Sequence, residues 1–178
     1  MSFSETNPGG TVSGDFSKLE ALIKELGKKY YVDIGILGEN NQTVEGGLTL
    51  AGIGAVHEFG TDKAGRGNKT VIPERSFIRM PLETGQSQIE AQIEPKIKDG
   101  TDIKQIFKLI GIAGEARIKE AFDTSGFGTW KPNSDITING SKPNKDGVKF
   151  IKGKKSDKPL IDEGTLKDGI MSKPGVNQ

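Results

Sequence analysis

The sequence predicts an α+β protein with long polar loops or arms, and three observations support this class. Apolar residues recur at helical spacing in several segments, most regularly between residues 103 and 122. Residues 30–37 alternate between β-forming and smaller or polar side chains, as a half-buried strand does. The stretches 60–70 and 124–158 hold many Gly, Asn, Lys and other polar residues, which disfavour regular structure.

The composition fits one domain with a modest core. The chain has 178 residues, of which 33% are apolar, and this length corresponds to a single domain. We expect residues 15–170 to form that domain, with an extended connector at 124–158, a flexible segment at 1–14 and a C-terminal tail at 171–178. The 25 basic and 24 acidic residues nearly balance, so net charge does not indicate nucleic acid as a partner.

Targeting and redox signals are absent from the sequence pattern. Residues 1–14 are polar and lack the basic start and apolar run of a secretory signal. No apolar stretch approaches the roughly 18 residues of a membrane span. The chain has no cysteine, which excludes disulfides and thiolate chemistry. We therefore expect a soluble protein that is assembled in a cytoplasm.

The first half of the chain predicts a helix, a strand and a second helix. The first helix, over residues 15–26 with Gly27 as its stop, follows from a stripe of Phe16, Leu19, Leu22, Ile23 and Leu26. The strand covers residues 30–37. Residues 50–59 place their apolar side chains on one helical face, although each internal glycine costs about 1 kcal/mol relative to alanine. Residues 60–70 then predict a mobile or partner-ordered loop.

The second half predicts two longer helices and a hairpin. Pro73 favours an extended segment at 71–77, and Pro81 suits the first turn of a helix that Pro95 should kink or end. The segment 103–122 predicts the longest helix, with Thr101 as its cap. Beyond it, residues 136–138 and 148–151 alternate like strands, and the NKDG turn at 144–147 would join them as a hairpin.

Candidate catalytic groups are few. His57 is the only histidine and lies beside Glu58, but a metal site would need further ligands, such as the second histidine of an HExxH helix. Asp162 and Glu163 are typical of a turn that binds backbone amides. The glycine-rich stretches GIGAVHEFG and GRGNKT lack phosphate-loop spacing. We expect no catalytic residue, no metal and no cofactor.

Other residues suggest contacts with partners. A basic tract near the C-terminus is typical of a solvated or protein-facing segment and contains Lys149, Lys152, Lys154, Lys155 and Lys158. Trp130 fits equally a lid on the core or an interface anchor. Because the helices supply little apolar area, we expect neighbouring molecules to complete the burial.

Three passages taken together resemble one known family. AVHEFGTDKAG (55–65) is similar to a motif of a hydrophobic residue followed by His-Glu-[Phe/Tyr]-Gly, and IPERSFIRMPLE (72–83) to Ile-Pro-x-Arg-x-Phe-[Leu/Ile]-Arg. WKPNSD (130–135) and KPLIDEGTLKDGI (158–170) resemble Trp-x-Pro-Leu-Ser and Leu-Ile-Asp-Thr-Gly-x-Leu-x-x-Ser-Ile. The family is the virion-morphogenesis, or tail-completion, proteins of tailed bacteriophages. The chain departs from it at Asn133, Glu163 and Gly169.

The resemblance implies helices packed on a small antiparallel β-sheet and a structural, non-enzymatic role. The protein would complete the head-proximal end of a phage tail and help join tail to head, in the neck of a virion assembled in the host cytoplasm. Its partners would be copies of itself in a six-fold closed ring and neighbouring tail and connector proteins, near phage DNA but not a membrane. The interface candidates are His57, Glu58, Phe59, Arg66, Arg75, Phe77, Arg79, Trp130, Lys152, Lys154, Lys155 and Asp162.

Alternative functions remain open. A tail terminator or a head–tail stopper would use a similar ring at an adjacent level. A small hydrolase would need His57 and either Glu58 or Asp162 to converge in a pocket. A DNA-contacting module that uses residues 149–158 would show affinity that falls steeply with salt.

Overall fold

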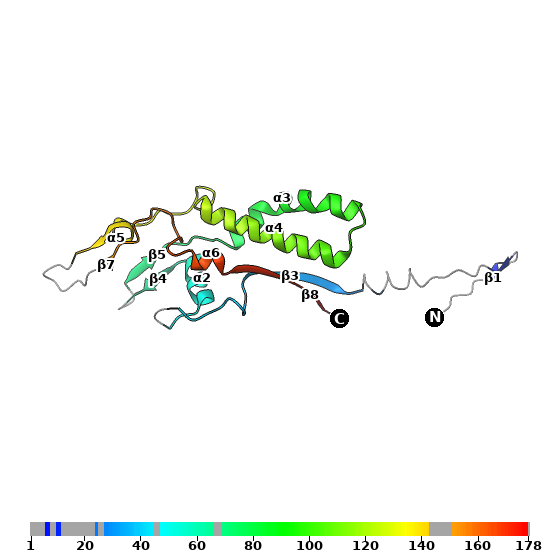
Figure 1. The fold of residues 1–178 in the computed structure, drawn as a ribbon, viewed down its shortest axis with the longest axis horizontal. Helices are drawn as coiled ribbons and strands as arrows, with labels where there is room; N and C mark the ends of the chain where they lie inside the picture. The colour runs from blue at the N-terminus through cyan, green and yellow to red at the C-terminus, as the bar shows by residue number, and fades with distance from the viewer. Residues whose placement is uncertain are drawn as a thin grey trace.

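The computed structural model describes residues 6–7, 10–11, 24, 27–44, 47–65, 69–142 and 151–177 (Figure 1). Its helices are α2 (Leu50–Phe59), α3 (Arg79–Lys98), α4 (Ile103–Asp123), α5 (Asp135–Asn139) and α6 (Thr165–Asp168). Its strands form four antiparallel pairs: β1 (Thr6–Asn7) with β2 (Gly10–Thr11), β3 (Lys29–Ile36) with β8 (Ile170–Asn177), β4 (Thr61–Ala64) with β5 (Thr70–Ile72), and β6 (Gly140–Ser141) with β7 (Ile151–Lys152). This mixture confirms the α+β class.

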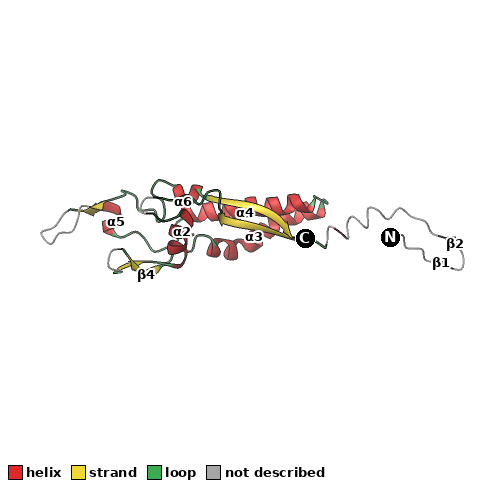
Figure 2. Cartoon of the chain, turned by 90° about the horizontal axis from the view of Figure 1, so that it is seen from below, coloured by secondary structure: helices red, strands yellow, loops and turns green. Residues whose placement is uncertain are grey.

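The centre of the fold is the β3–β8 ribbon with two helices lying along it (Figures 1 and 2). The ribbon is paired over its full length, from Lys29 opposite Asn177 to Ile36 opposite Ile170. Helix α4 contacts both strands, and α3 packs against α4 as the second arm of a helix hairpin. Helices α2 and α6 pack near the end of the ribbon at which Ile36 pairs with Ile170, and the main core lies there.

Two glycines let α4 approach the ribbon closely. A Cβ atom at Gly114 would lie 2.5 Å from Cδ1 of Ile34, and one at Gly111 would lie 2.9 Å from Cβ of Ser172. Both distances are too short for a side chain, so the helix backbone itself forms part of this interface.

The main core is built from aromatic and aliphatic residues of several elements. Phe77, Ile118 and Phe122 are fully buried. The ring of Phe122 lies 5.2 Å from that of Phe77 and 5.7 Å, edge to face, from that of Trp130, distances at which aromatic pairs attract. The polar extensions α5, β6, β7 and the β4–β5 hairpin lie beyond this core, at the end opposite the α3–α4 connection (Figure 1).

The structure corrects several expectations for the extensions. Residues 60–70, predicted as a loop, contain strand β4 and the first residue of β5, and Thr61 pairs with Ile72. Residues 136–138, predicted as a strand, lie in helix α5, whose N-cap Ser134 accepts a hydrogen bond from the amide of Thr137. The connector 124–158 also includes the β6–β7 pair. The predicted NKDG turn at 144–147 lies outside the described residues.

Other expectations concern the helix ends and the termini. Pro95 does not end its helix, which continues to Lys98, and Asp102 rather than Thr101 caps α4 by accepting from the amide of Lys104. The expected C-terminal tail forms most of β8, so that prediction was wrong. The segment expected to be flexible at the N-terminus includes the β1–β2 pair. Of the predicted helix 15–26, only Lys24 is described, and it is helical. No helix in the described ranges is long and apolar enough to cross a bilayer.

Candidate functional site

The His-Glu-Phe-Gly and Ile-Pro-Glu-Arg-Ser-Phe passages meet at the buried carboxylate of Glu58. Its Oε2 accepts from the backbone amides of Phe77 (2.7 Å) and Ile78 (2.9 Å). Its Oε1 accepts from the hydroxyl of Ser76 (2.6 Å) and from the amide of Arg79 (3.0 Å). These amides form the N-terminus of α3, where the N-cap residue Ile78 supplies no side-chain cap. Glu58 therefore caps α3 from α2, with its charge at the positive end of the helix dipole.

Arg75 joins the second passage to the Trp-Lys-Pro-Asn passage. Its Nε donates to the carbonyl of Lys131 (2.9 Å) and its Nη2 to the carbonyl of Pro132 (3.1 Å) and to Oδ1 of Asn133 (3.4 Å). Burial lowers the pKa of Arg75 from its usual value, but the guanidinium stays charged at neutral pH. The planar guanidinium thus fixes three consecutive residues in one orientation.

Asn133 and Trp130 complete this framework. The amide nitrogen of Asn133 donates to the carbonyls of Asp157 (3.2 Å) and Lys158 (3.1 Å), which ties WKPNSD to the start of KPLIDEGTLKDGI. A leucine at this position, as in the family motif, could not make these bonds. Nε1 of Trp130 donates to the carbonyl of Ser76 (3.2 Å), so this buried ring is part of the core.

A cavity of about 900 Å³ lies beside the framework and brings together several of the interface candidates. His57, Arg75, Lys154 and Asp162 all line it, together with apolar residues of α2 and α6. Nζ of Lys154 donates to the carbonyls of Lys158 and Ile161, each at 2.8 Å, so this lysine supports the wall of the cavity. The sequence indicates Lys154 as part of a basic tract and as an interface candidate, but does not predict these two hydrogen bonds.

Burial and nearby positive charges disfavour the charged form of His57 in this cavity. Burial lowers its pKa below the usual 6.5, and the nearby charges of Arg75 and Lys154 lower it further. Its buried Nδ1 has no hydrogen-bond partner among the residues that the structure describes. Burial also lowers the pKa of Lys154, an effect that Asp162 opposes. Among mainly apolar side chains, the basic residues Arg75, Lys131 and Lys154 and the acidic residues Asp162 and Glu163 line the cavity, so its charges nearly balance.

A small hydrolase would need His57 and either Glu58 or Asp162 to converge in a pocket, and the structure meets this requirement only in part. His57 and Asp162 do line one cavity, but within the described residues no hydrogen bond joins them. Glu58 is unsuited to acid–base chemistry because both its oxygens already accept hydrogen bonds from the start of α3. The arrangement supports a structural use of these charged residues.

The remaining interface candidates divide by exposure. Glu58, Arg75, Phe77 and Trp130 are buried, so their side chains organise the fold and leave little surface for a partner. Phe59 is 68% exposed, and Arg79, Lys152, Lys155 and Asp162 are exposed as well. Arg66 lies outside the described residues. Val71, which the sequence analysis did not select, is also 68% exposed.

Comparison with known proteins gives no relative: no family model, no curated protein and no solved structure matches the chain.

Proposed function

We propose that this chain is a structural virion protein that completes the head-proximal end of a bacteriophage tail and helps join the tail to the head. It acts as one subunit of a closed ring. The observation that carries the proposal is the physical union of the family-like passages: Glu58 binds the start of α3, Arg75 binds residues 131–133, and Asn133 binds residues 157–158.

These hydrogen bonds explain why a non-catalytic structural protein would hold polar residues such as Glu58, Arg75 and Asn133 within its motifs. Glu58 and Arg75 make most of their hydrogen bonds to backbone atoms, and these bonds fix the geometry of the segments that they join. The fixed framework carries the β4–β5 hairpin and the α5–β6–β7 arm outward (Figure 1). A ring subunit needs such a rigid centre with extensions that reach neighbouring subunits.

The test is electron microscopy of virus particles assembled without this protein. We expect free heads beside tails that fail to join them, and restoration of joined particles when the intact chain is supplied. Tails of normal length would support completion, whereas overlong tails would favour a tail terminator. Normal infectious particles would rule out the whole proposal.

A further inference from the structure

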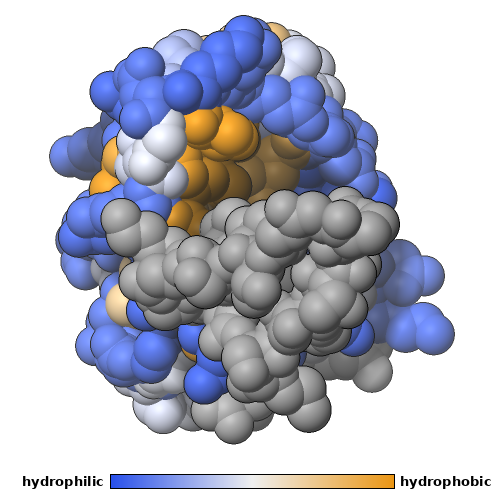
Figure 3. Space-filling model, turned by 90° about the vertical axis from the view of Figure 1, so that its right-hand side faces the viewer, coloured by the Kyte–Doolittle hydropathy of each residue, from blue (hydrophilic) through white to orange (hydrophobic). Residues whose placement is uncertain are grey.

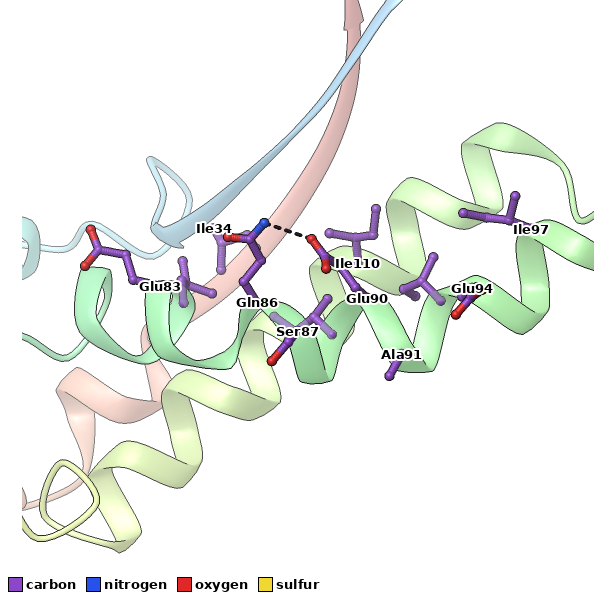
Figure 4. A pocket seen from close by; sticks show the side chains of 12 residues that line it. Ile34, Glu83, Gln86, Ser87, Glu90, Ala91, Glu94, Ile97 and Ile110 are labelled. Atoms are coloured by element: carbon purple, nitrogen blue, oxygen red, sulfur yellow. Dashed lines mark hydrogen bonds between the residues drawn. The ribbon is translucent and has the colours of Figure 1, made fainter.

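An apolar groove runs between α3, α4 and β3, with a volume of about 870 Å³ (Figure 4). Ile34 and Ile110 line it from the strand and from α4, and Ile93 and Ile97 line it from α3. Figure 3 shows hydrophobic residues gathered in a hollow, bordered by hydrophilic ones, on the end of the molecule where α3 joins α4. Such a hollow is typical of a binding surface for an apolar partner.

The described residues leave this groove open. Ile97 is 60% exposed at one end of the groove. The amide side chain of Gln86 and the carboxylate of Glu90 lie along its edge, where Gln86 donates a 2.8 Å hydrogen bond to Glu90 (Figure 4). This edge is polar and the interior is apolar, which is the arrangement that accepts one face of an amphipathic helix.

We propose that the groove binds residues 15–26 of a second copy of this chain as an amphipathic helix. That segment carries the apolar stripe of Phe16, Leu19, Leu22, Ile23 and Leu26. Lys24 lies within it and is helical. A helix with such a stripe is stable in water only when the stripe is covered.

The length of the groove agrees with the length of a helix over residues 15–26. The residues of α3 that line the groove run from Leu82 to Ile97, which is about 22 Å along a helix axis. A helix over residues 15–26 is about 18 Å long, so it fits within the groove.

The position of the N-terminal residues favours a second copy over the same chain. Figures 1 and 2 agree that β1 lies beyond the end of the α3–α4 hairpin, away from the groove. Binding of this segment in the groove of the next copy is a head-to-tail contact, the type that closes rings. The inference thus names one contact of the proposed ring, but it does not need the phage assignment.

The absence of cysteine from the natural sequence allows a direct test. Full-length Leu22→Cys protein is mixed with full-length Ile89→Cys protein and treated with a short bismaleimide cross-linker. Because each chain has one thiol, a cross-link between the two variants can form only between copies. We expect at least a tenfold higher yield of the mixed dimer than in the control mixture of Leu22→Cys with Ile112→Cys.

Ile112 is a suitable control because it is an exposed isoleucine of α4 outside the groove. Equal yields in the two mixtures, or no mixed dimer, would overturn the inference. A single chain carrying both Leu22→Cys and Ile89→Cys must likewise cross-link to a second chain, and a product of monomer size would overturn it in favour of the same chain. If the protein still sedimented as a ring in those cases, the proposed function would stand while this contact failed.

As a second readout, Ile23→Asp should dissociate the oligomer in sedimentation, whereas the neighbouring Lys24→Asp, off the apolar stripe, should not. An unchanged oligomer in Ile23→Asp would also contradict the proposed contact.

Discussion

His57 is held in a setting that disfavours its charged form, and this makes stability depend on pH. Its pKa in the folded protein is lowered by burial and by the charges of Arg75 and Lys154. Below pH 6.5 the unfolded chain binds a proton on this side chain more readily than the folded protein does. The contribution of His57 to the free energy of unfolding is therefore fully present well above pH 6.5, and it is lost as the pH falls through 6.5 toward the lowered pKa of the folded protein.

We predict that the free energy of unfolding decreases between about pH 7.5 and about pH 5.5, a range above most carboxyl titrations. His57→Gln should flatten this decrease, because no other histidine titrates in the chain. Urea unfolding at a series of pH values measures the effect. Arg79→Gln is the control, since Arg79 does not perturb His57, and it should keep the wild-type slope. An equal slope in His57→Gln would show that other groups cause the dependence.

Glu58 shows how one side chain can join two helices. It lies at the end of α2 and binds three backbone amides at the start of α3, which otherwise begins without a side-chain cap. These donors are sheltered from water, so losing their acceptor leaves them unsatisfied.

We predict that Glu58→Gln lowers the free energy of unfolding by about 1–3 kcal/mol, because one carboxylate oxygen becomes an NH₂ group facing other donors. Glu74→Gln is the matched control. Both carboxylates form an ion pair with Arg79, Glu58 at 3.9 Å and Glu74 at 2.8 Å, but Glu74 lies on the surface, where such pairs contribute at most about 1 kcal/mol. Urea unfolding of both variants gives the comparison. Equal losses would mean that Glu58 acts only as a surface charge partner of Arg79.

The elements with strong apolar periodicity could be predicted from the sequence. Helix α4 and strand β3 were found within one or two residues, because each buries one regular face. Helix α5 was missed because three alternating residues do not separate a strand from a single helical turn, although Ser134 offered a capping signal. Strand β8 was missed because Pro174 and Gly175 are unusual within strands.

The site was less predictable than the fold. The family-like passages contain Glu58, Arg75 and Trp130, but the sequence could not reveal that all three side chains are buried in the interior. Their partners are mainly backbone atoms far away in the chain, such as the carbonyls of Lys131 and Pro132. Every residue has such backbone groups, so the amino-acid sequence does not indicate which of them a side chain will bind. Asn133 could have been found, since an amide that replaces an apolar motif residue indicates a new hydrogen bond.

Two of the most exposed apolar side chains lie in and beside the β4–β5 hairpin. Phe59 and Val71 are each 68% exposed and belong to the end of the molecule that carries the β4–β5 hairpin. Covering such side chains stabilises a complex without affecting the subunit, which is the behaviour expected of an assembly surface.

Phe59 and Phe77 therefore provide a matched pair for testing assembly against folding. Phe59→Ser should change the free energy of unfolding by less than about 0.5 kcal/mol, as is usual for exposed positions, yet weaken ring assembly in sedimentation. Phe77→Ser should destabilise the subunit by at least about 3 kcal/mol, because Phe77 is fully buried beside Phe122. Should Phe59→Ser assemble as the natural chain does, this end of the molecule is not the ring contact, and the apolar groove beside α3 becomes the principal surface between copies.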